Sequence, residues 1–301
     1  MIQILVSDGL EKSAVAKLEE MGYAAVLQFY GPEELGERLQ SFDALVIRSK
    51  TKVRAAIIDQ AAKTGRLKLI VRAGVGVDNV DVAYAESKGI AVENTPGAST
   101  ESVAELAVGL MFGLARHIYA ADRSMHRGEW EKKLFEGTEL AGKTLGLIGL
   151  GRIGKRVAAK ATALGMRAVY TNRSGHRPEN EPYRHLSLDE LCGVSDYISL
   201  HMPKADEVIL SAGNFEKMKN GVCLINTSRG GLIDEKDLLD ALDAGKIAAA
   251  ALDVFAEEPC ANQRLRTHPK LLLTPHIGAS TSEAQRRVGE EVVQKIVQYF
   301  S

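Results

Sequence analysis

The sequence contains few cysteines. Cys192, Cys223 and Cys260 are the only three in 301 residues, and they are widely spaced. An odd number at such spacing fits neither a disulfide framework nor a cysteine metal site, so we expect reduced thiols and no bound metal.

A surplus of charge is also missing. The chain has 38 basic and 39 acidic residues, for a formal net charge of -1. Such a balance creates no overall field to attract nucleic acid or an anionic membrane, so we expect neither partner. Any preference for an anionic small molecule must therefore come from a local cluster of cations.

Long apolar runs and a leader segment are absent too. No stretch approaches the ~20 apolar residues of a membrane span. The chain begins with the strand-like Ile2-Gln3-Ile4-Leu5-Val6, without a basic region or cleavage site. We therefore expect a cytoplasmic protein.

What the sequence does contain is a regular alternation. Short runs of Val, Ile and Leu alternate with helix-length amphipathic stretches, which is typical of βαβ units and buried parallel sheets. The candidate strands are Ile2–Ser7, Ala44–Ile47, Leu69–Arg72, Thr144–Ile148, Arg167–Thr171, Tyr197–Leu200, Val222–Asn226, Ala249–Val254 and Leu271–Leu273. They are too many for one small domain. The sequence predicts an α/β fold with two Rossmann-like or flavodoxin-like open parallel-sheet domains separated by a cleft.

The domain boundary is expected where Pro96 and Gly97 break the strand pattern. The first domain then comprises residues 1–95 plus 280–301, because the last amphipathic segment can pack back on it. The second comprises residues 96–279. It starts with a helix from Thr100 that is apolar on most of its surface, and such a helix lies either in the core or against a second subunit.

A glycine-rich loop follows the strand Thr144–Ile148. It reads Gly149-Leu150-Gly151-Arg152-Ile153-Gly154 and leads into a helical stretch, which is G-x-G-x-x-G in its strand-turn-helix setting. Gly149 permits the tight turn, Gly151 lets the backbone approach a pyrophosphate, and Gly154 allows close helix packing. The pattern predicts a dinucleotide site that includes Arg152 and Ile153.

The next strand ends at Asn172-Arg173-Ser174, where an acidic residue would hold the ribose 2'-hydroxyl of NAD. No carboxylate is present there. An amide, a guanidinium and a hydroxyl suit a 2'-phosphate better, so NADP is favoured over NAD. The alternative is that Arg173 is an ordinary loop residue and the protein uses NAD.

Three polar residues follow buried strand patterns in the second domain: Arg229, Glu258 and His276. The carboxyl ends of parallel strands meet at one edge of a sheet, so these side chains can converge. An arginine can bind a carboxylate, a histidine can exchange a proton near neutral pH, and a glutamate can orient that histidine. Each has an ordinary structural explanation when taken singly.

Two segments of the first domain carry cations. Arg48-Ser49-Lys50-Thr51-Lys52-Val53-Arg54 places four cations after a strand, either to hold a phosphate or as a chance surface cluster. Arg72-Ala73-Gly74-Val75-Gly76 adds an arginine and amides that could bind a carboxylate. The candidate substrate contacts are Arg48, Ser49, Lys52, Arg72, Gly74, Val75 and Gly76.

These motifs together resemble one family. The run "TSRGGLIDEKDLLDALDAGKIAAAALDVF", then "EEP" and "TPHIGAST", is similar to D-2-hydroxyacid dehydrogenases, and so are "VRAGVGVDNVD", "NTPGASTESVAELAVGLM" and "GLIGLGRIG" in the same order. The resemblance spans nearly the whole chain. It implies that Arg229 binds substrate, His276 is the acid/base and Glu258 is its partner. It further implies cofactor contacts at His201, Pro203, Thr227, Asp253 and Gly278.

Within the family, R-S-x-T-K-V followed by R-A-G-x-G-V-D-N resembles phosphoglycerate dehydrogenases. The resemblance implies a small anionic substrate, interconversion of D-3-phosphoglycerate and 3-phosphohydroxypyruvate in serine biosynthesis, and a homodimer. The chain ends soon after its last helix, so no serine-binding regulatory domain is expected. The alternatives are an NADPH-preferring glyoxylate or hydroxypyruvate reductase, a sulfolactate-type dehydrogenase, and a dinucleotide-sensing scaffold without catalysis.

Overall fold

A computed structural model describes residues 1–180 and 182–301, and the chain divides into two compact units. Unit 1 comprises Met1–Ser99 and Ala279–Ser301, and unit 2 comprises Thr100–Gly278. The limits expected from the sequence lie within a few residues of these. Each unit contains its own parallel sheet, as the predicted fold class requires.

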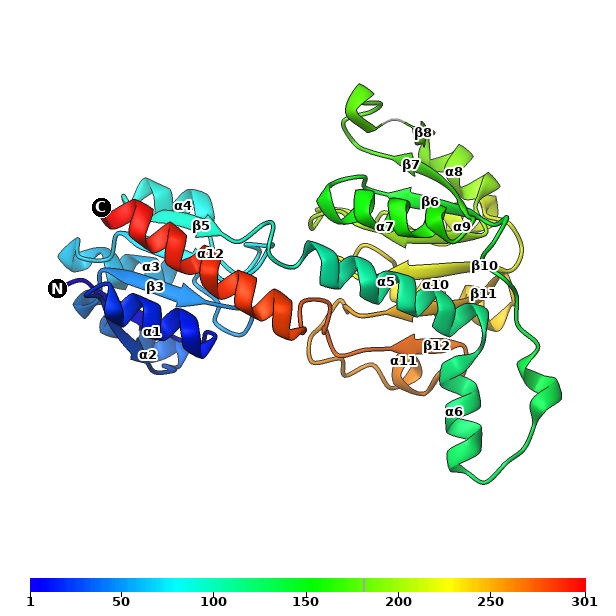
Figure 1. The fold of residues 1–301 in the computed structure, drawn as a ribbon, viewed down its shortest axis with the longest axis horizontal. Helices are drawn as coiled ribbons and strands as arrows, with labels where there is room; N and C mark the ends of the chain where they lie inside the picture. The colour runs from blue at the N-terminus through cyan, green and yellow to red at the C-terminus, as the bar shows by residue number, and fades with distance from the viewer. Residues whose placement is uncertain (181) are drawn as a thin grey trace. The chain divides into compact units, whose positions relative to one another are not determined.

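Unit 1 is built on a five-stranded sheet in the order β2-β1-β3-β4-β5, of which Figure 1 labels β3 and β5. The strands are β1 (Gln3–Val6), β2 (Ala24–Leu27), β3 (Ala44–Ile47), β4 (Leu69–Arg72) and β5 (Ala91–Asn94), and each pair is parallel. The helices are α1 (Lys12–Glu20), α2 (Pro32–Arg38), α3 (Ala55–Ala61), α4 (Val82–Ser87) and α12 (Ser282–Phe300). In this flavodoxin-like order the sheet direction switches between β1 and β3, and ligands bind beyond the carboxyl ends of strands at such a point.

The C-terminal helix α12 belongs to the core of unit 1, as expected. Its apolar face buries Val288, Val292 and Ile296 against β1, β3 and β4. Gly289 lies so close to α1 that a Cβ there would be 2.7 Å from the Cβ of Ala14. This packing holds the amino-terminal end of α12 beside the loops of unit 1.

Unit 2 contains a seven-stranded parallel sheet in the order β12-β11-β10-β9-β6-β7-β8. The strands are β6 (Thr144–Ile148), β7 (Arg167–Thr171), β8 (Arg184–His185), β9 (Tyr197–Leu200), β10 (Val222–Asn226), β11 (Ile247–Leu252) and β12 (Leu271–Leu273). The helices are α5 (Thr100–Ala115), α6 (Ile118–His126), α7 (Arg152–Ala163), α8 (Leu188–Val194), α9 (Ala212–Lys217), α10 (Glu235–Asp243) and α11 (Gln263–Thr267). This is the doubly wound order of dinucleotide-binding sheets, with its switch point between β6 and β9.

Helix α5 is a core helix of unit 2. Ala104, Ala107 and Met111 are fully buried, and the helix packs on α7 and on the sheet through the cluster that contains them. The segment after it is different: α6 and the short helix Lys132–Phe135 extend from the unit in Figure 1. In the described part of the chain no single helix is long and apolar enough to cross a bilayer, and α5 and α6 pass that test only together, across a 65° bend.

The structure corrects four of the strand assignments. β2, β5 and β8 are strands that the hydrophobic pattern did not single out, and β11 begins at Ile247, two residues before the predicted start at Ala249. β2, β5 and β8 lie at sheet edges and are only partly buried, so their sequences lack a continuous apolar run.

Candidate functional site

The glycine loop lies between β6 and α7, at the switch point of the unit 2 sheet. Gly149 has a φ of +99°, and a Cβ there would be 2.4 Å from the carbonyl oxygen of His201. A Cβ at Gly154 would be 2.3 Å from the carbonyl oxygen of Gly149. At Gly151 a Cβ would meet no atom within 4 Å, so the backbone there borders open space at the start of a twelve-residue helix. This arrangement suits a pyrophosphate.

Two buried polar atoms near the carboxyl edge of the same sheet have no partner among the described residues. They are Nδ1 of His201, after β9, and Oγ1 of Thr227, after β10. Burial lowers the pKa of His201 to about 3, so its ring is neutral, and Nε2 pairs with the Ser199 hydroxyl at 2.8 Å. Buried polar atoms normally have partners, so these two atoms fit a polar ligand such as a dinucleotide. Pro203 follows His201 in the same loop and is exposed.

The end of β7 is organised differently from the expectation. The Asn172 side-chain oxygen accepts a hydrogen bond from the Leu150 amide at 2.8 Å, so this residue braces the glycine loop. Arg173 and Ser174 are exposed beside it. The Arg177 Nε donates to the Ser174 hydroxyl at 3.1 Å, which adds a second guanidinium that the sequence pattern did not single out. Arg152 and Ile153 form the first turn of α7.

His276 and Glu258 are in direct contact. The Nδ1 of His276 lies 2.7 Å from Oε2 of Glu258, and each side chain is about two-fifths exposed, 41% and 37%. With Nδ1 engaged by the carboxylate, Nε2 is the nitrogen that remains for proton exchange. The predicted pairing of these two residues, 18 positions apart, is therefore present.

The Glu258 carboxylate is held in its charged form. Burial acts to raise its pKa, but the hydrogen bond and charge of His276, the amide of Phe255 and the charge of Arg229 outweigh that effect and lower it. The Phe255 amide donates to Oε1 at 3.1 Å. Glu258 is therefore an acceptor for the imidazole at neutral pH.

Arg229 lies on the loop that touches the Glu258 loop. A Cβ on its neighbour Gly230 would be 1.7 Å from the carbonyl oxygen of Phe255, so the two backbones are in contact. Asn226, at the end of β10, donates to the Arg229 carbonyl at 2.8 Å. The structure therefore brings the guanidinium, carboxylate and imidazole to one edge of the unit 2 sheet.

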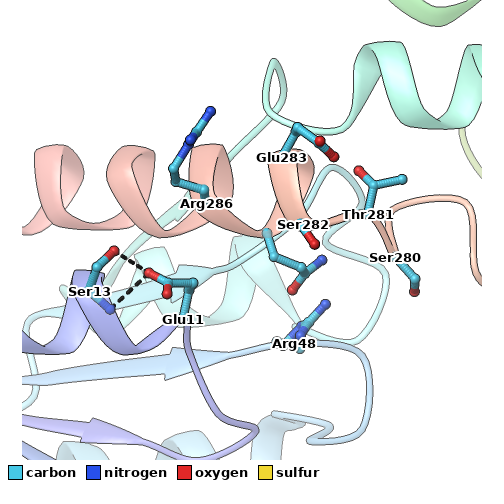
Figure 2. A pocket seen from close by; sticks show the side chains of 9 residues that line it. Glu11, Ser13, Arg48, Ser280, Thr281, Ser282, Glu283 and Arg286 are labelled. Atoms are coloured by element: carbon cyan, nitrogen blue, oxygen red, sulfur yellow. Dashed lines mark hydrogen bonds between the residues drawn. The ribbon is translucent and has the colours of Figure 1, made fainter.

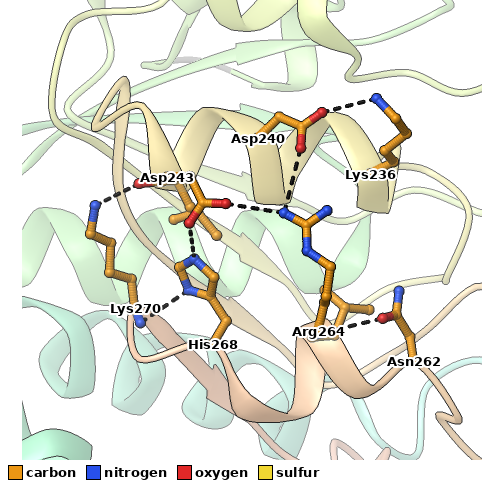
Figure 3. A network of polar contacts seen from close by, with 9 residues as sticks. Lys236, Asp240, Asp243, Asn262, Arg264, His268 and Lys270 are labelled. Carbon is orange, nitrogen blue, oxygen red and sulfur yellow. Dashed lines mark hydrogen bonds and ion pairs between the residues drawn. The ribbon is translucent and has the colours of Figure 1, made fainter.

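A polar network anchors the chain between Glu258 and His276 (Figure 3). Asp243, at the end of α10, accepts from Arg264 at 3.0 Å and pairs with Nε2 of His268 at 3.2 Å. Lys270 donates to the Leu242 carbonyl at 2.5 Å. These contacts fix α11 and the start of β12 on α10. The remaining predicted contacts, Asp253 and Gly278, bond to each other, with the Gly278 amide 2.9 Å from Oδ2 of Asp253.

In unit 1 the loop after β3 is rigidly held at the switch point. Asp8, which follows β1, accepts from the amides of Arg48 and Thr51 at 2.8 and 2.9 Å. The Asn79 side chain donates to the carbonyls of the same two residues, each at 2.7 Å. The backbone that carries Arg48 is therefore fixed on both sides.

The four cations of this loop do not form one cluster. The Lys50 ammonium lies 3.8 Å from the centre of the Phe29 ring, and Arg54 pairs with Asp81 at 2.8 Å. Lys52 and Ser49 are exposed. The expectation of a four-cation phosphate site is corrected, because Arg48 is the member of the loop that lines a cavity.

That cavity, of about 720 Å³, lies between the Arg48 loop and the amino-terminal end of α12 (Figure 2). Gln285 and Arg286 line it from the helix, together with Ser280, Thr281, Ser282 and Glu283. Glu11 also lines it, but its carboxylate caps α1 by accepting from the Ser13 amide at 2.9 Å. Sequence reasoning missed Gln285 and Arg286, because only the return of α12 to unit 1 brings them beside Arg48.

The structure corrects one of the contacts expected after β4, that of the Gly74 amide. The amide of Gly74 donates to the Arg72 carbonyl at 2.8 Å, so it is not available to a ligand. A Cβ at Gly74 would be 1.5 Å from Nη1 of Arg72, which means that the guanidinium lies over this glycine. Val75 and Gly76 follow in the same partly buried loop. Among the described residues, no group of three His, Cys, Asp or Glu side chains is placed to hold a metal.

Comparisons with known proteins agree with this geometry. Residues 108–278 match the model of the NAD-binding domain of D-isomer specific 2-hydroxyacid dehydrogenases. The chain is 47% identical to a hydroxypyruvate reductase of Thermotoga maritima, covering 98% of this chain and 97% of the relative. It is 46% identical to a D-3-phosphoglycerate dehydrogenase of Methanocaldococcus jannaschii, covering 98% of this chain but only 57% of that longer protein.

One similar solved structure contains a nicotinamide cofactor. An acyclic imino acid reductase in complex with NADPH and D-Arg matches with a TM-score of 0.90 at 30% identity, covering 99% of this chain and 97% of that one. The chain therefore belongs to the D-isomer specific 2-hydroxyacid dehydrogenase family, whose members transfer a hydride between a nicotinamide dinucleotide and the CH–OH carbon of a 2-hydroxy acid.

Proposed function

We propose that this enzyme interconverts D-3-phosphoglycerate and 3-phosphohydroxypyruvate with NADP as cofactor, as an entry step to serine. The observation that carries the choice of substrate is the cavity of unit 1, where Arg48 lies with Arg286 and the amino-terminal end of α12. The Arg48 guanidinium and the first turn of a long helix suit a phosphate, whereas the Arg286 guanidinium lies near Glu290 of its own helix, at 3.9 Å.

His276 is the acid/base in this proposal. A bound nicotinamide dinucleotide supplies or accepts the hydride. In reduction, the His276 imidazolium donates its Nε2 proton to the carbonyl oxygen of the 2-keto acid, and in oxidation the neutral imidazole takes the hydroxyl proton. Glu258, 2.7 Å from Nδ1, favours the imidazolium and fixes the ring. Arg229 binds the substrate carboxylate.

The preference for NADP rests on the end of β7. Asn172 stands where a carboxylate would bind the ribose hydroxyl of NAD, and its side-chain oxygen is already used by the Leu150 amide. Arg173 precedes Ser174 in the same exposed loop, and Arg177 donates to the Ser174 hydroxyl and pairs with Glu179 at 3.7 Å. Two guanidinium groups beside a hydroxyl favour a 2'-phosphate.

The second candidate is a hydroxypyruvate or glyoxylate reductase. The match to a hydroxypyruvate reductase over nearly its whole length supports it, as does a cofactor site suited to NADPH. In that case the unit 1 cavity would not hold a phosphate. A sulfolactate-type substrate would use the same cations, because a sulfonate is also anionic.

A homodimer in the cytoplasm is part of the proposal. The segment from the end of α5 through Lys132–Phe135 exposes Ile118, Met125, Trp130 and Leu134, with Trp130 79% accessible. Large apolar side chains gathered in one exposed segment suit a protein interface.

Steady-state reduction of phosphohydroxypyruvate, hydroxypyruvate and glyoxylate, each with NADH and NADPH, tests the proposal. We expect kcat/KM to be highest for phosphohydroxypyruvate with NADPH. Equal kcat/KM values for the three acids would contradict a preference for a phosphorylated substrate and favour the hydroxypyruvate or glyoxylate reductase. NADPH binding without turnover of any 2-keto acid would favour a dinucleotide-sensing scaffold.

A further inference from the structure

Asp253 is a fully buried carboxylate directly after β11. Its backbone amide donates to the Asn226 carbonyl at 2.9 Å, which fixes it to the end of β10. Burial raises its pKa, although the hydrogen bonds it receives and the charge of His276 act in the opposite direction. A buried acid is retained only where its oxygens have defined partners.

The donors to the Asp253 carboxylate in the described structure come from one turn, residues 274–278. The Thr274 hydroxyl and the Ile277 amide donate to Oδ1 of Asp253 at 2.6 and 2.8 Å. The Gly278 amide donates to Oδ2 at 2.9 Å. One carboxylate therefore binds the turn before and after His276.

The turn needs such support, because His276 has a left-handed backbone with a φ of +54°. A residue other than glycine adopts this conformation at a cost and keeps it only when its surroundings fix it. The far end of the turn is held independently, since the Ser102 hydroxyl of α5 donates to the Gly278 carbonyl at 2.7 Å.

We propose that Asp253 is a positioning residue for His276: its carboxylate holds the 274–278 turn so that Nδ1 of His276 meets Glu258 and Nε2 is presented for proton exchange. This inference rests on the proposed role of His276. It differs from a contact with the nicotinamide amide, because two backbone amides and a hydroxyl of the turn already use both oxygens.

The substitutions Asp253→Asn and Thr274→Val test this role. Asparagine has the same shape but places an NH2 group against one of the backbone amides, so the turn must shift. Valine removes one donor and keeps the other two bonds. Thr267→Val in α11 is the matched control, because the Thr267 hydroxyl bonds only within its own helix, to the Gln263 carbonyl.

The first readout is independent of activity. The pH titration of the His276 ring resonances is followed by NMR in the protein without cofactor, and the signals are assigned by their loss in His276→Asn. In Thr274→Val, which leaves the charge of Asp253 in place, we expect the titration midpoint to move from that of the parent, because the imidazole loses its fixed contact with Glu258. In Asp253→Asn the loss of the nearby negative charge adds to this effect. The control variant should titrate like the parent. An unchanged titration in Thr274→Val would overturn the proposal, whether or not the proposed substrate is correct.

The second readout separates positioning from cofactor binding. Asp253→Asn should lower kcat by about 100-fold, the scale expected for a displaced catalytic group, while the Kd for NADPH changes less than about twofold. Thr274→Val should lower kcat in the same direction by less. A weakened NADPH affinity in Asp253→Asn, with Thr274→Val unchanged in all respects, would assign Asp253 to the nicotinamide instead. If the parent reduces no 2-keto acid, the proposed function fails and the NMR result still decides this inference.

Discussion

The backbone of Gly230 lies directly against that of Phe255, and a Cβ on Gly230 would be 1.7 Å from the Phe255 carbonyl oxygen. This contact joins the loop of Arg229 to the loop of Glu258. Neither backbone can give way alone, because the Phe255 amide also donates to Glu258 and Asn226 holds the Arg229 carbonyl.

Gly230→Ala should therefore separate Arg229 from Glu258 and His276. We expect kcat/KM to fall by about 100-fold, since a shift of about 1 Å at a catalytic group has that effect. The control is Gly109→Ala in α5, where a Cβ would meet no atom within 4 Å and alanine favours the helix. Steady-state kinetics with near-parental activity in Gly230→Ala would show that the two loops do not act together.

Arg173→Asp should reverse the preference for the cofactor. The carboxylate would repel a 2'-phosphate and accept a hydrogen bond from the ribose hydroxyl of NAD. We expect the ratio of kcat/KM for NADPH to that for NADH to fall at least about tenfold, one charge-assisted contact being worth about 1.5–3 kcal/mol. Arg184→Asp, at the exposed start of β8, is the control for a general charge effect. An unchanged ratio in Arg173→Asp would mean that Arg173 is an ordinary loop residue that does not bind the 2'-phosphate.

Arg48→Gln should affect phosphorylated and unphosphorylated substrates differently. Arg48 lines the unit 1 cavity, so its loss should raise KM for phosphohydroxypyruvate by about tenfold or more and change KM for hydroxypyruvate much less. Lys50→Gln is the control, because it removes one positive charge from the same loop. It should leave the KM for both substrates unchanged, since the Lys50 ammonium lies on the Phe29 ring. Equal effects of Arg48→Gln on both substrates would contradict a phosphate contact at this residue.

Sequence reasoning located the residues of unit 2 because each follows a strand at the carboxyl edge of a parallel sheet. That rule places Gly149, Arg229 and His276 without coordinates. It could not show that Asn172 is used by the Leu150 amide or that the Gly74 amide bonds to Arg72, because such local contacts depend on side-chain and backbone geometry.

The hydrophobic pattern also could not predict contacts between segments that are distant in the sequence. Gln285 and Arg286 join Arg48 only because α12 packs on β1, β3 and β4. The edge strand β2 lacks the continuous apolar run of a central strand, which is why hydrophobic periodicity overlooked it.

His201 predicts how stability depends on pH. Burial lowers its pKa from 6.5 to about 3, so between these values the unfolded chain binds a proton that the folded chain does not. Stability therefore falls as the pH falls through this window, by about 2 kcal/mol between pH 8 and pH 5 from this group alone. In His201→Gln, which keeps a polar group near Ser199, this part of the pH dependence should disappear. Urea unfolding at pH 8 and pH 5 measures this change in the free energy of unfolding. An equal change in parent and variant would mean that His201 is protonated in the folded protein.

The central claim is that His276 exchanges the proton that accompanies hydride transfer. The most direct measurement is single-turnover reduction of the 2-keto acid by His276→Asn, chosen because asparagine tolerates the left-handed backbone at this position. We predict that NADPH binds with unchanged affinity and that the rate falls by at least about 100-fold, the usual contribution of a general acid. A variant that binds NADPH and turns over at the parental rate would contradict the account.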